Sequence, residues 1–402
     1  MGTINKIIYL ANSRVPTEKA HGYQICKMCE AFAENGVEVQ LWHPFRHQFD
    51  PKLQKQSGFD YYGIRPIFQV KTLPNWDVVR LNCLVPDNWF TPIFFAHGLL
   101  WGLYAARAAA AEKADIYFTR DGTTAYWLTK LGLPTVYEAH VVPKRAQRGI
   151  LRRIARDAAL RLVVVLTSFI KEEFVKMGFP DEKIAVAPDG VDLSLFAELP
   201  SKDACRGRFD LPPDRPIVGY IGRFRTMEME KGVPTLIHAM KYLHSINGKE
   251  PLLLCVGGPM EAVPSYLDLA RRYGLAENNL RFIDRVSNRE VPLWMRACDV
   301  VTIPWGWTEF SAYYTSPLKL FEYMAAGVPM LASDLPSLRE VLRDEENALL
   351  VTPDNPEQLC AGIVRLTTDA ALGERLARCA SQDVRRYSWE GRARQILQNS
   401  TN

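Results

Sequence analysis

The chain has 402 residues, of which 23% are charged and 48% apolar, and its formal net charge is +4. These values are ordinary for a soluble globular protein, and nothing in them indicates nucleic-acid recognition. The length predicts two domains. The N-terminus shows no apolar run long enough for a secretory signal, so we expect a cytoplasmic protein.

Short apolar segments rich in β-branched residues alternate with helical segments along the chain. In the first half the expected strands cover residues 6–10, 37–42, 116–119, 135–139, 162–166 and 184–187. In the second half they cover residues 217–221, 252–256, 280–283, 300–304, 329–332 and 349–351. Strands of this kind are covered on both faces, so we expect an α/β fold of two doubly wound, Rossmann-like parallel sheets. A cluster of prolines places the domain boundary near Glu198–Arg215, so the first domain is expected to end at residue 197.

Polar residues follow several of the expected strands in the first half. In open α/β sheets, ligands bind at these carboxyl ends. Arg120 and Asp121 follow one strand, and Glu138 and His140 lie at the end of the next. They could orient a ligand or accept a proton, although a solvated turn histidine is the alternative. Gly22, after the first strand, allows close approach of a ligand to the backbone, or is a plain turn glycine.

Two further segments of the first half suggest contact with a membrane surface. Residues 144–161 are strongly basic, with only Asp157 opposing, and predict attraction to anionic lipid head groups or to an anionic acceptor. A solvated basic helix is the alternative. Residues 90–103 are strongly apolar but too short to span a bilayer, so we interpret them as a buried helix, with dipping into a membrane as the second possibility.

The run Ser-Pro-Leu-Lys-Leu-Phe-Glu-Tyr-Met-Ala-Ala-Gly-Val-Pro at 316–329 predicts a short helix followed by a strand. Ser316 is a natural N-cap with Pro317 at the first helical position, and Gly327 is a natural C-cap. A helix N-terminus binds anions, and Glu322 lies one and a half turns inside the helix. The pattern suits a nucleotide, with amides for its phosphates and Glu322 for its ribose. An ordinary capped helix is the alternative.

This run resembles the donor-site signature of the family-four retaining glycosyltransferases (glycosyl transferases group 1), which have the GT-B fold. The resemblance implies two Rossmann-like domains facing across a cleft: an acceptor domain at 1–197 and a nucleotide-sugar domain at 198–385. It also implies that a C-terminal helix, here 386–402, crosses back toward the first domain. The family has a first Glu where this chain has Tyr314, and Glu309 is a possible substitute.

The resemblance also implies roles for individual residues. It implies that Gly22 faces the donor phosphates, that His140 touches the donor sugar, and that Arg223 and Lys231 bind the diphosphate, with Lys231 at a longer spacing than usual. The remaining donor-binding candidates come from the turns and the helix start of the second half: Gly257, Arg285, Tyr314, Thr315, Ser316, Leu318 and Glu322. Arg120, Asp121 and Glu138 are candidates for holding the sugar or the acceptor.

The chain contains no Asp-x-Asp motif, the paired carboxylates that usually hold a metal on a diphosphate. We therefore expect no metal and no cofactor, with the positive charge supplied by Arg223, Lys231 and the helix N-terminus. The expected donor is a UDP- or GDP-sugar. The expected acceptor is a hydroxyl group on a lipid-linked compound or a saccharide, as in glycolipid or cell-surface polysaccharide synthesis.

Two other functions compete with sugar transfer. A non-catalytic member of the same fold could bind a nucleotide sugar or a partner subunit without transferring anything, and Tyr314 is its best support. A two-domain binding protein of the periplasmic type is the third possibility. The expected absence of a signal peptide and the set Arg223, Lys231 and Glu322 argue against it.

Overall fold

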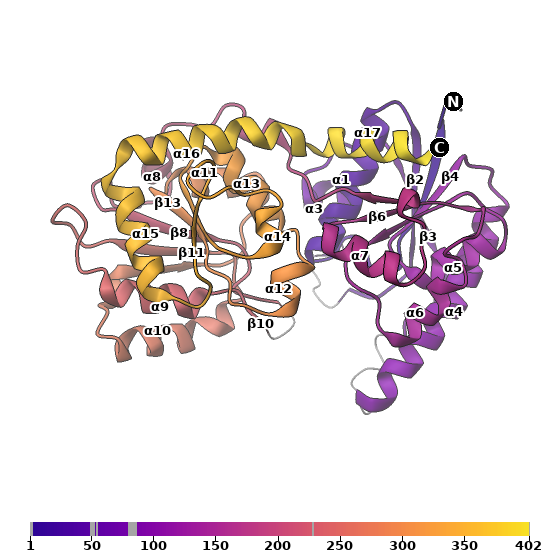
Figure 1. Cartoon of the computed structure of the whole chain (residues 1–402), viewed down its shortest axis with the longest axis horizontal. Coiled ribbons are helices and arrows are strands. Elements are labelled where there is room, and N and C mark those ends of the chain that lie inside the picture. Colours follow the sequence, from indigo (N-terminus) through magenta and orange to yellow (C-terminus); the bar gives the residue numbers. More distant parts are fainter. Residues whose placement is uncertain (1–2, 49–52, 54, 79–86, 227–228, 402) are drawn as a thin grey trace. The chain divides into compact units, whose positions relative to one another are not determined.

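The structure, a computed structural model, describes residues 3–48, 53, 55–78, 87–226 and 229–401 (Figure 1). The chain forms two compact units: unit 1 comprises Met1–Pro188 and Trp389–Asn402, and unit 2 comprises Asp189–Ser388. The division after Pro188 comes earlier than the boundary expected from the prolines, and the return to unit 1 comes slightly later than residue 386.

Unit 1 contains a seven-stranded parallel sheet in the order β3-β2-β1-β4-β5-β6-β7. Its strands are β1 (Lys6–Leu10), β2 (Glu38–Pro44), β3 (Gln69–Leu73), β4 (Ile116–Thr119), β5 (Thr135–Ala139), β6 (Leu160–Val165) and β7 (Ile184–Val186). Its helices are α1 (Ala20–Glu34), α3 (Gly58–Tyr62), α4 (Asp87–Ala110), α5 (Gly122–Lys130), α6 (Arg145–Arg152), α7 (Ser168–Lys176), η2 (Asp181–Lys183) and α17 (Trp389–Ser400). The last helix, α17, packs on α1 and β6.

Unit 2 contains a six-stranded parallel sheet in the order β12-β11-β8-β13-β14-β15. Its strands are β8 (Ile217–Ile221), β11 (Leu252–Val256), β12 (Leu280–Ile283), β13 (Val300–Ile303), β14 (Met330–Ser333) and β15 (Leu349–Val351), with a separate hairpin of β9 (Arg225–Thr226) and β10 (Met229–Glu230). Its longer helices are α8 (Lys202–Arg208), α9 (Val233–Tyr242), α10 (Val263–Arg272), α13 (Leu318–Ala326), α15 (Pro356–Thr368) and α16 (Ala370–Asp383). The shorter ones are α11 (Val291–Arg296), α12 (Glu309–Tyr313), α14 (Pro336–Arg339), η3 (Leu193–Phe196), η4 (Met260–Ala262), η5 (Glu277–Asn279) and η6 (Val384–Tyr387).

Both faces of the unit 2 sheet are buried. Along β8, Ile217 and Ile221 join a core with α11 and α13, whereas Val218 and Tyr220 join a second core with α9, α10 and α15. This alternation explains why β8 is apolar at successive positions. The doubly wound α/β fold expected from the sequence is confirmed in both units.

The apolar helix of unit 1 is not the buried helix that we expected. α4 buries Trp101 and Ala105 against α5, but its outer side exposes 69% of Leu100 and 43% of Tyr104. Residues Pro92–Ala110 of this helix are long and apolar enough to cross a membrane by length and composition, and 33% of them are buried. The basic segment 144–161 is likewise not one helix, because α6 ends at Arg152 and Arg161 belongs to β6.

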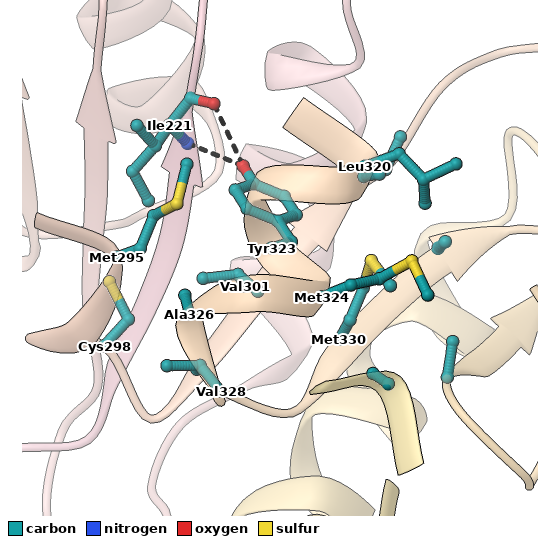
Figure 2. Packing of buried hydrophobic residues seen from close by; sticks show 14 of the residues in the cluster. Ile221, Met295, Cys298, Val301, Leu320, Tyr323, Met324, Ala326, Val328 and Met330 are labelled. Atoms are coloured by element: carbon teal, nitrogen blue, oxygen red, sulfur yellow. Dashed lines mark hydrogen bonds between the residues drawn. The ribbon is translucent and has the colours of Figure 1, made fainter. Parts of the chain in front are cut away.

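The hydroxyl of Tyr323 joins α13 to the end of β8 (Figure 2). It accepts a hydrogen bond from Ile221 N–H (2.8 Å) and donates one to the Ile221 carbonyl oxygen (3.1 Å). The residue pairs between β8 and β13 are Val218–Val300 and Gly219–Val301. Ile221 lies beyond these pairs, and the Tyr323 hydroxyl satisfies both its buried N–H and its buried carbonyl oxygen.

We predict that Tyr323→Phe destabilises unit 2 by about 1–3 kcal/mol, because both Ile221 groups would be buried without a partner. The measurement is urea unfolding of the full chain, and the control is Tyr242→Phe on the exposed side of α9. Equal stabilities of the two variants would show that the Tyr323 hydroxyl does not hold β8.

Candidate functional site

The sheet of unit 2 reverses its winding between β8 and β13, which makes the carboxyl ends of these strands its topological switch point. Gly222 and Arg223 follow β8, and Trp305 follows β13 after one residue. The Arg223 side chain is exposed. The Thr302 hydroxyl donates to the Gly219 carbonyl oxygen (3.0 Å), just before the strands part. Donor-site candidates from separate stretches of sequence therefore meet at the position where α/β sheets bind ligands.

Lys231 reaches this position although its spacing from Arg223 is long, because the β9–β10 hairpin takes up intervening residues. Its backbone N–H donates to the Phe224 carbonyl oxygen (2.9 Å), which closes the loop. Its Nζ lies 4.7 Å from the ring centroid of Trp305 and 5.7 Å from that of Phe310. Burial lowers the pKa of Lys231. The neighbouring Arg225 pairs with Glu230.

Glycines bring the loops of this site close together. Gly232 has a φ of 85°, and a Cβ there would lie 1.8 Å from the Pro304 carbonyl oxygen after β13. A Cβ on Gly257, whose φ is 134°, would lie 2.5 Å from the Gly222 carbonyl oxygen. Gly257 thus lets the turn after β11 pack on the turn after β8. Arg285, after β12, is exposed, and its backbone N–H donates to Asp284 Oδ1 (2.7 Å).

The donor-site helix begins later than we expected. α13 starts at Leu318 with Pro317 as N-cap, and no side chain caps it. The expectation that Ser316 caps the helix was wrong, because the Ser316 hydroxyl instead accepts from the Asp189 backbone N–H (3.0 Å). Thr315 is buried. Gly327 ends the helix in the left-handed conformation, as expected. The first amides of α13 therefore have no side-chain cap, although the Leu320 N–H donates to the Pro317 carbonyl oxygen (2.9 Å).

Lys319 is the residue of this site that sequence reasoning missed. Its Nζ is buried, lies 3.8 Å from the Tyr220 ring centroid, and has no hydrogen-bond partner among the residues that the structure describes. Burial, and next the charge of Lys231, lower the pKa of Lys319 to about 7. Burial raises the pKa of Glu322 to about 7, against the opposing effect of Lys319. The sequence did contain a signal, namely a lysine in the first turn of the expected helix, where the helix dipole disfavours a cation.

Tyr314 and Glu309 lie together. The Tyr314 hydroxyl donates to Glu309 Oε1 at 3.2 Å, and the Glu309 side chain is exposed. The residue at the position of the family's first Glu and its proposed substitute thus form one hydrogen-bonded pair, which offers a phenol and a carboxylate from the two ends of α12.

In unit 1, Glu138 is fully buried beneath His140. Its Oε1 accepts from Arg392 Nη2 (2.6 Å) and from His140 Nε2 (2.8 Å). Burial alone would raise the pKa of Glu138, but Arg392 and His140 outweigh it and hold that pKa well below its ordinary value. Burial and Arg120 lower the pKa of His140 to about 4. The imidazole is therefore neutral at pH 7, with its proton on Nε2 and its Nδ1 as an acceptor.

Three of the ligand-binding candidates in unit 1 make contacts within the protein. Asp121 caps α5, where its carboxylate accepts from Thr124 N–H (2.9 Å). Gly22 lies in the first turn of α1, and a Cβ there would lie 2.0 Å from the Tyr62 hydroxyl. The group that approaches this backbone closely is therefore the Tyr62 side chain, where a ligand was expected. Arg120 donates to Gln24 Oε1 at 2.5 Å. Glu138, being fully buried, acts on ligands only through His140.

Among the described residues, no group of three or more His, Cys, Asp and Glu side chains is placed to hold a metal ion. The sequence does contain one His-x-x-x-His spacing, His43 and His47, around the end of β2. His43 Nδ1 lies 3.1 Å from the Pro44 carbonyl oxygen and its Nε2 lies 3.1 Å from Thr72 Oγ1, so its ring is held by hydrogen bonds within the unit.

We predict that Glu138→Gln destabilises the protein by about 3–5 kcal/mol, because it leaves the Arg392 guanidinium buried without a counter-charge. Urea unfolding followed by tryptophan fluorescence measures the effect. Glu390→Gln, which removes a carboxylate of an exposed pair on the same helix as Arg392, is the control and should change stability by less than about 1 kcal/mol. A loss as small as that of the control would contradict the role given to the buried pair.

The comparisons with known proteins agree with this geometry. The family model described as Glycosyltransferase Family 4 matches residues 22–195, and the one described as Glycosyl transferases group 1 matches residues 215–369. A D-inositol 3-phosphate glycosyltransferase of Xylanimonas cellulosilytica is 30% identical, covering 80% of this chain and 74% of the relative. The protein of that name from Stackebrandtia nassauensis is 28% identical, covering 93% and 84%.

Solved structures share the fold of the whole chain. Sucrose-phosphate synthase from Thermosynechococcus elongatus has a TM-score of 0.73 at 20% identity, with 98% of each chain covered. HepE of Anabaena in complex with UDP has a TM-score of 0.73 at 19% identity, covering 98% of this chain and 99% of HepE. Together with the relatives and the family models, these matches show that the chain belongs to the group 1 glycosyltransferases and is a glycosyltransferase enzyme of two Rossmann-like domains.

Proposed function

We propose that the enzyme moves a sugar from a UDP- or GDP-sugar to a hydroxyl acceptor, with retention of the anomeric configuration and without a metal ion. The observation that carries the proposal is the switch point of unit 2, where Arg223 follows β8 and Lys231 lies near Lys319 and Glu322 of α13. Solved structures of HepE contain UDP and UDP-glucose, which supports a nucleotide-sugar donor.

The chemistry of this site favours departure of a diphosphate. When the bond between the sugar carbon and the phosphate oxygen breaks, the electron pair stays on the diphosphate. Arg223, Lys231 and the α13 amides stabilise that charge electrostatically. The acceptor oxygen forms the new bond to the sugar carbon and loses its proton, for which the departing phosphate is a suitable base. Glu322 accepts hydrogen bonds from the ribose.

His140 and the pair Tyr314–Glu309 are proposed to contact the sugar. A neutral imidazole with Nδ1 as acceptor binds a sugar hydroxyl but is a weak base, since the pKa of His140 is about 4. The phenol of Tyr314 can donate and accept, whereas an ionised Glu only accepts. This pair therefore affects which sugar fits.

The acceptor is proposed to be a saccharide, a lipid-linked compound or a related polyol. The relatives are named D-inositol 3-phosphate glycosyltransferases, so a phosphorylated cyclitol belongs among the acceptors to test. The non-catalytic alternative is disfavoured, because the family and the relatives are transferases.

We predict that UDP or GDP raises the melting temperature without added metal and in the presence of EDTA. A ligand that binds only the native state at a hundredfold excess over its dissociation constant stabilises it by about 2.7 kcal/mol. Sugar transfer from UDP- and GDP-sugars to an acceptor panel should then release the nucleoside diphosphate, and NMR of the product should show the anomeric configuration of the donor. Arg223→Ala should lower turnover on the order of a hundredfold.

The matched control is Arg271→Ala, which removes an exposed arginine of unit 2 paired with Asp268. It should leave turnover unchanged. If no nucleotide shifts the melting temperature, or if Arg223→Ala transfers sugar at the wild-type rate, the proposed donor site is wrong. A shift that EDTA abolishes contradicts the metal-independent mechanism.

We also propose that unit 1 touches the membrane surface, on the cytoplasmic side, through α4 and α6. Both helices pack on α5. The outer side of α4 exposes Leu100 and Tyr104, and Lys144, Arg145 and Arg152 are exposed in and beside α6. Apolar side chains next to basic ones suit an interface with anionic lipids, where each basic residue near the surface contributes about 1 kcal/mol.

We predict that the protein sediments with vesicles of phosphatidylcholine and phosphatidylglycerol more than with phosphatidylcholine alone. Reversing the charge of both Arg152 and Arg153 to Glu should lower this binding more than tenfold, since two contributions of about 1 kcal/mol each are lost. Arg271→Glu is the control. Equal binding of the double variant and the control would contradict this membrane surface.

A further inference from the structure

The Nζ atom of Lys319, a residue of intermediate exposure, is buried in a way that the fold alone does not explain. Lys319 is the second residue of α13, and its Nζ is covered by the Tyr220 ring and by Gly222, where a Cβ would lie 2.4 Å from Nζ. In the described part of the chain this Nζ makes no hydrogen bond, although Glu322 stands three residues further along the same helix. An amine that has lost its water and gained a ring contact but no hydrogen bond destabilises the ligand-free protein.

The groups around Lys319 leave positive charge in excess. Lys231 approaches from the loop before α9, Glu322 lies on α13 itself, and Tyr220 and Cys255 come from β8 and β11. Two lysine side chains thus lie near one carboxylate, and Arg223 follows β8 at the same edge of the sheet. The uncapped amides of α13 add a partial positive charge at the same place. An anion with at least two negative charges would balance the set.

We infer that Lys319 is a third cationic ligand of the donor diphosphate, resting against Tyr220 in the free enzyme and moving onto the phosphates when the donor binds. This inference rests on the proposed donor site and adds a residue to it. The four rotatable bonds of a lysine side chain allow the movement from the ring to the helix mouth.

The move has a protonation signature. With a pKa of about 7, the free amine is mostly neutral at pH 8, whereas an ammonium held by phosphates keeps its proton. Binding at pH 8 therefore takes up close to one proton from solvent at Lys319. Glu322 has a pKa of about 7 as well, so its share must be measured separately.

The experiment is isothermal titration calorimetry of UDP, GDP and uridine at pH 8 in two buffers with different ionisation enthalpies. The variants are Lys319→Met, Lys319→Arg and Glu322→Gln, with Lys241→Met on α9 as the control. Lys319→Met should weaken binding of the diphosphate about tenfold to a hundredfold, as expected for a hydrogen bond to a charged group, and leave uridine binding unchanged. It should also abolish most of the proton uptake.

Lys319→Arg separates charge from titration. Arginine stays protonated, so this variant should retain more diphosphate affinity than Lys319→Met but show no proton uptake from position 319. Removal of the buried amine should also raise the melting temperature of ligand-free Lys319→Met, which shows that the variant folds.

Each contrary result has a distinct meaning. If the wild-type enzyme binds neither UDP nor GDP, the proposed donor site and this inference both fail. If it binds UDP and Lys319→Met binds UDP equally well, this inference alone fails. It also fails if Lys319→Met weakens UDP and uridine equally, or if the proton uptake persists in Lys319→Met and disappears in Glu322→Gln.

Discussion

The proposed donor site depends on one phenol placed where two strands separate. At Ile221, beyond the residues paired with β13, the backbone of β8 still carries a buried N–H and a buried carbonyl oxygen. The Tyr323 hydroxyl satisfies both, so the opening of the sheet costs no unpaired polar group (Figure 2). The same contact fixes α13 against the end of β8 and sets the start of that helix beside Gly222. The contact between Tyr323 and Ile221 therefore determines both the packing of α13 on the sheet and the position of the proposed anion site.

The two units treat buried charge differently. In unit 1, Glu138 meets Arg392, which also donates to the carbonyl oxygens of Ala187 and Pro188 (3.0 and 2.8 Å). That guanidinium is fully used within the protein, so its role is to hold α17, β5 and β7 together and to orient His140. In unit 2, Lys319 is buried without such partners. The Arg392 guanidinium therefore supports the fold, whereas the Lys319 amine has no hydrogen bond within the described residues that would give it such a role.

Much of the fold could be predicted because strands that are buried on both faces are short, continuous apolar segments of the sequence. Segments 6–10, 217–221 and 252–256 are β-strands to the residue, since both of their faces are buried. β3 was missed because it is an edge strand whose first four residues are exposed, which leaves no apolar run. The failures at single residues have a common cause. Asp121 caps α5, Gly22 lies against the Tyr62 hydroxyl, and Ser316 accepts from the Asp189 backbone N–H. The last two contacts join residues far apart in the sequence, so they follow only from the tertiary structure.

Lys319 shows where sequence reasoning stops for the site itself. Its place in the first turn of a helix is unusual for a lysine, but the sequence does not show where the side chain goes. In the structure the absence of a side chain at Gly222 allows the amine to lie over the Tyr220 ring. The position of Gly222 depends in turn on Ile221, and hence on Tyr323. The charge of this site is therefore a property of three segments brought together: the end of β8, the loop before α9 and the first turn of α13. Because Lys319 and Glu322 share one helix face and the pKa of each lies near 7, both groups change charge near neutral pH when no donor is bound. A bound diphosphate would favour the protonated form of Lys319. Donor binding is thereby linked to the protonation of a helix residue that a search of strand ends does not find.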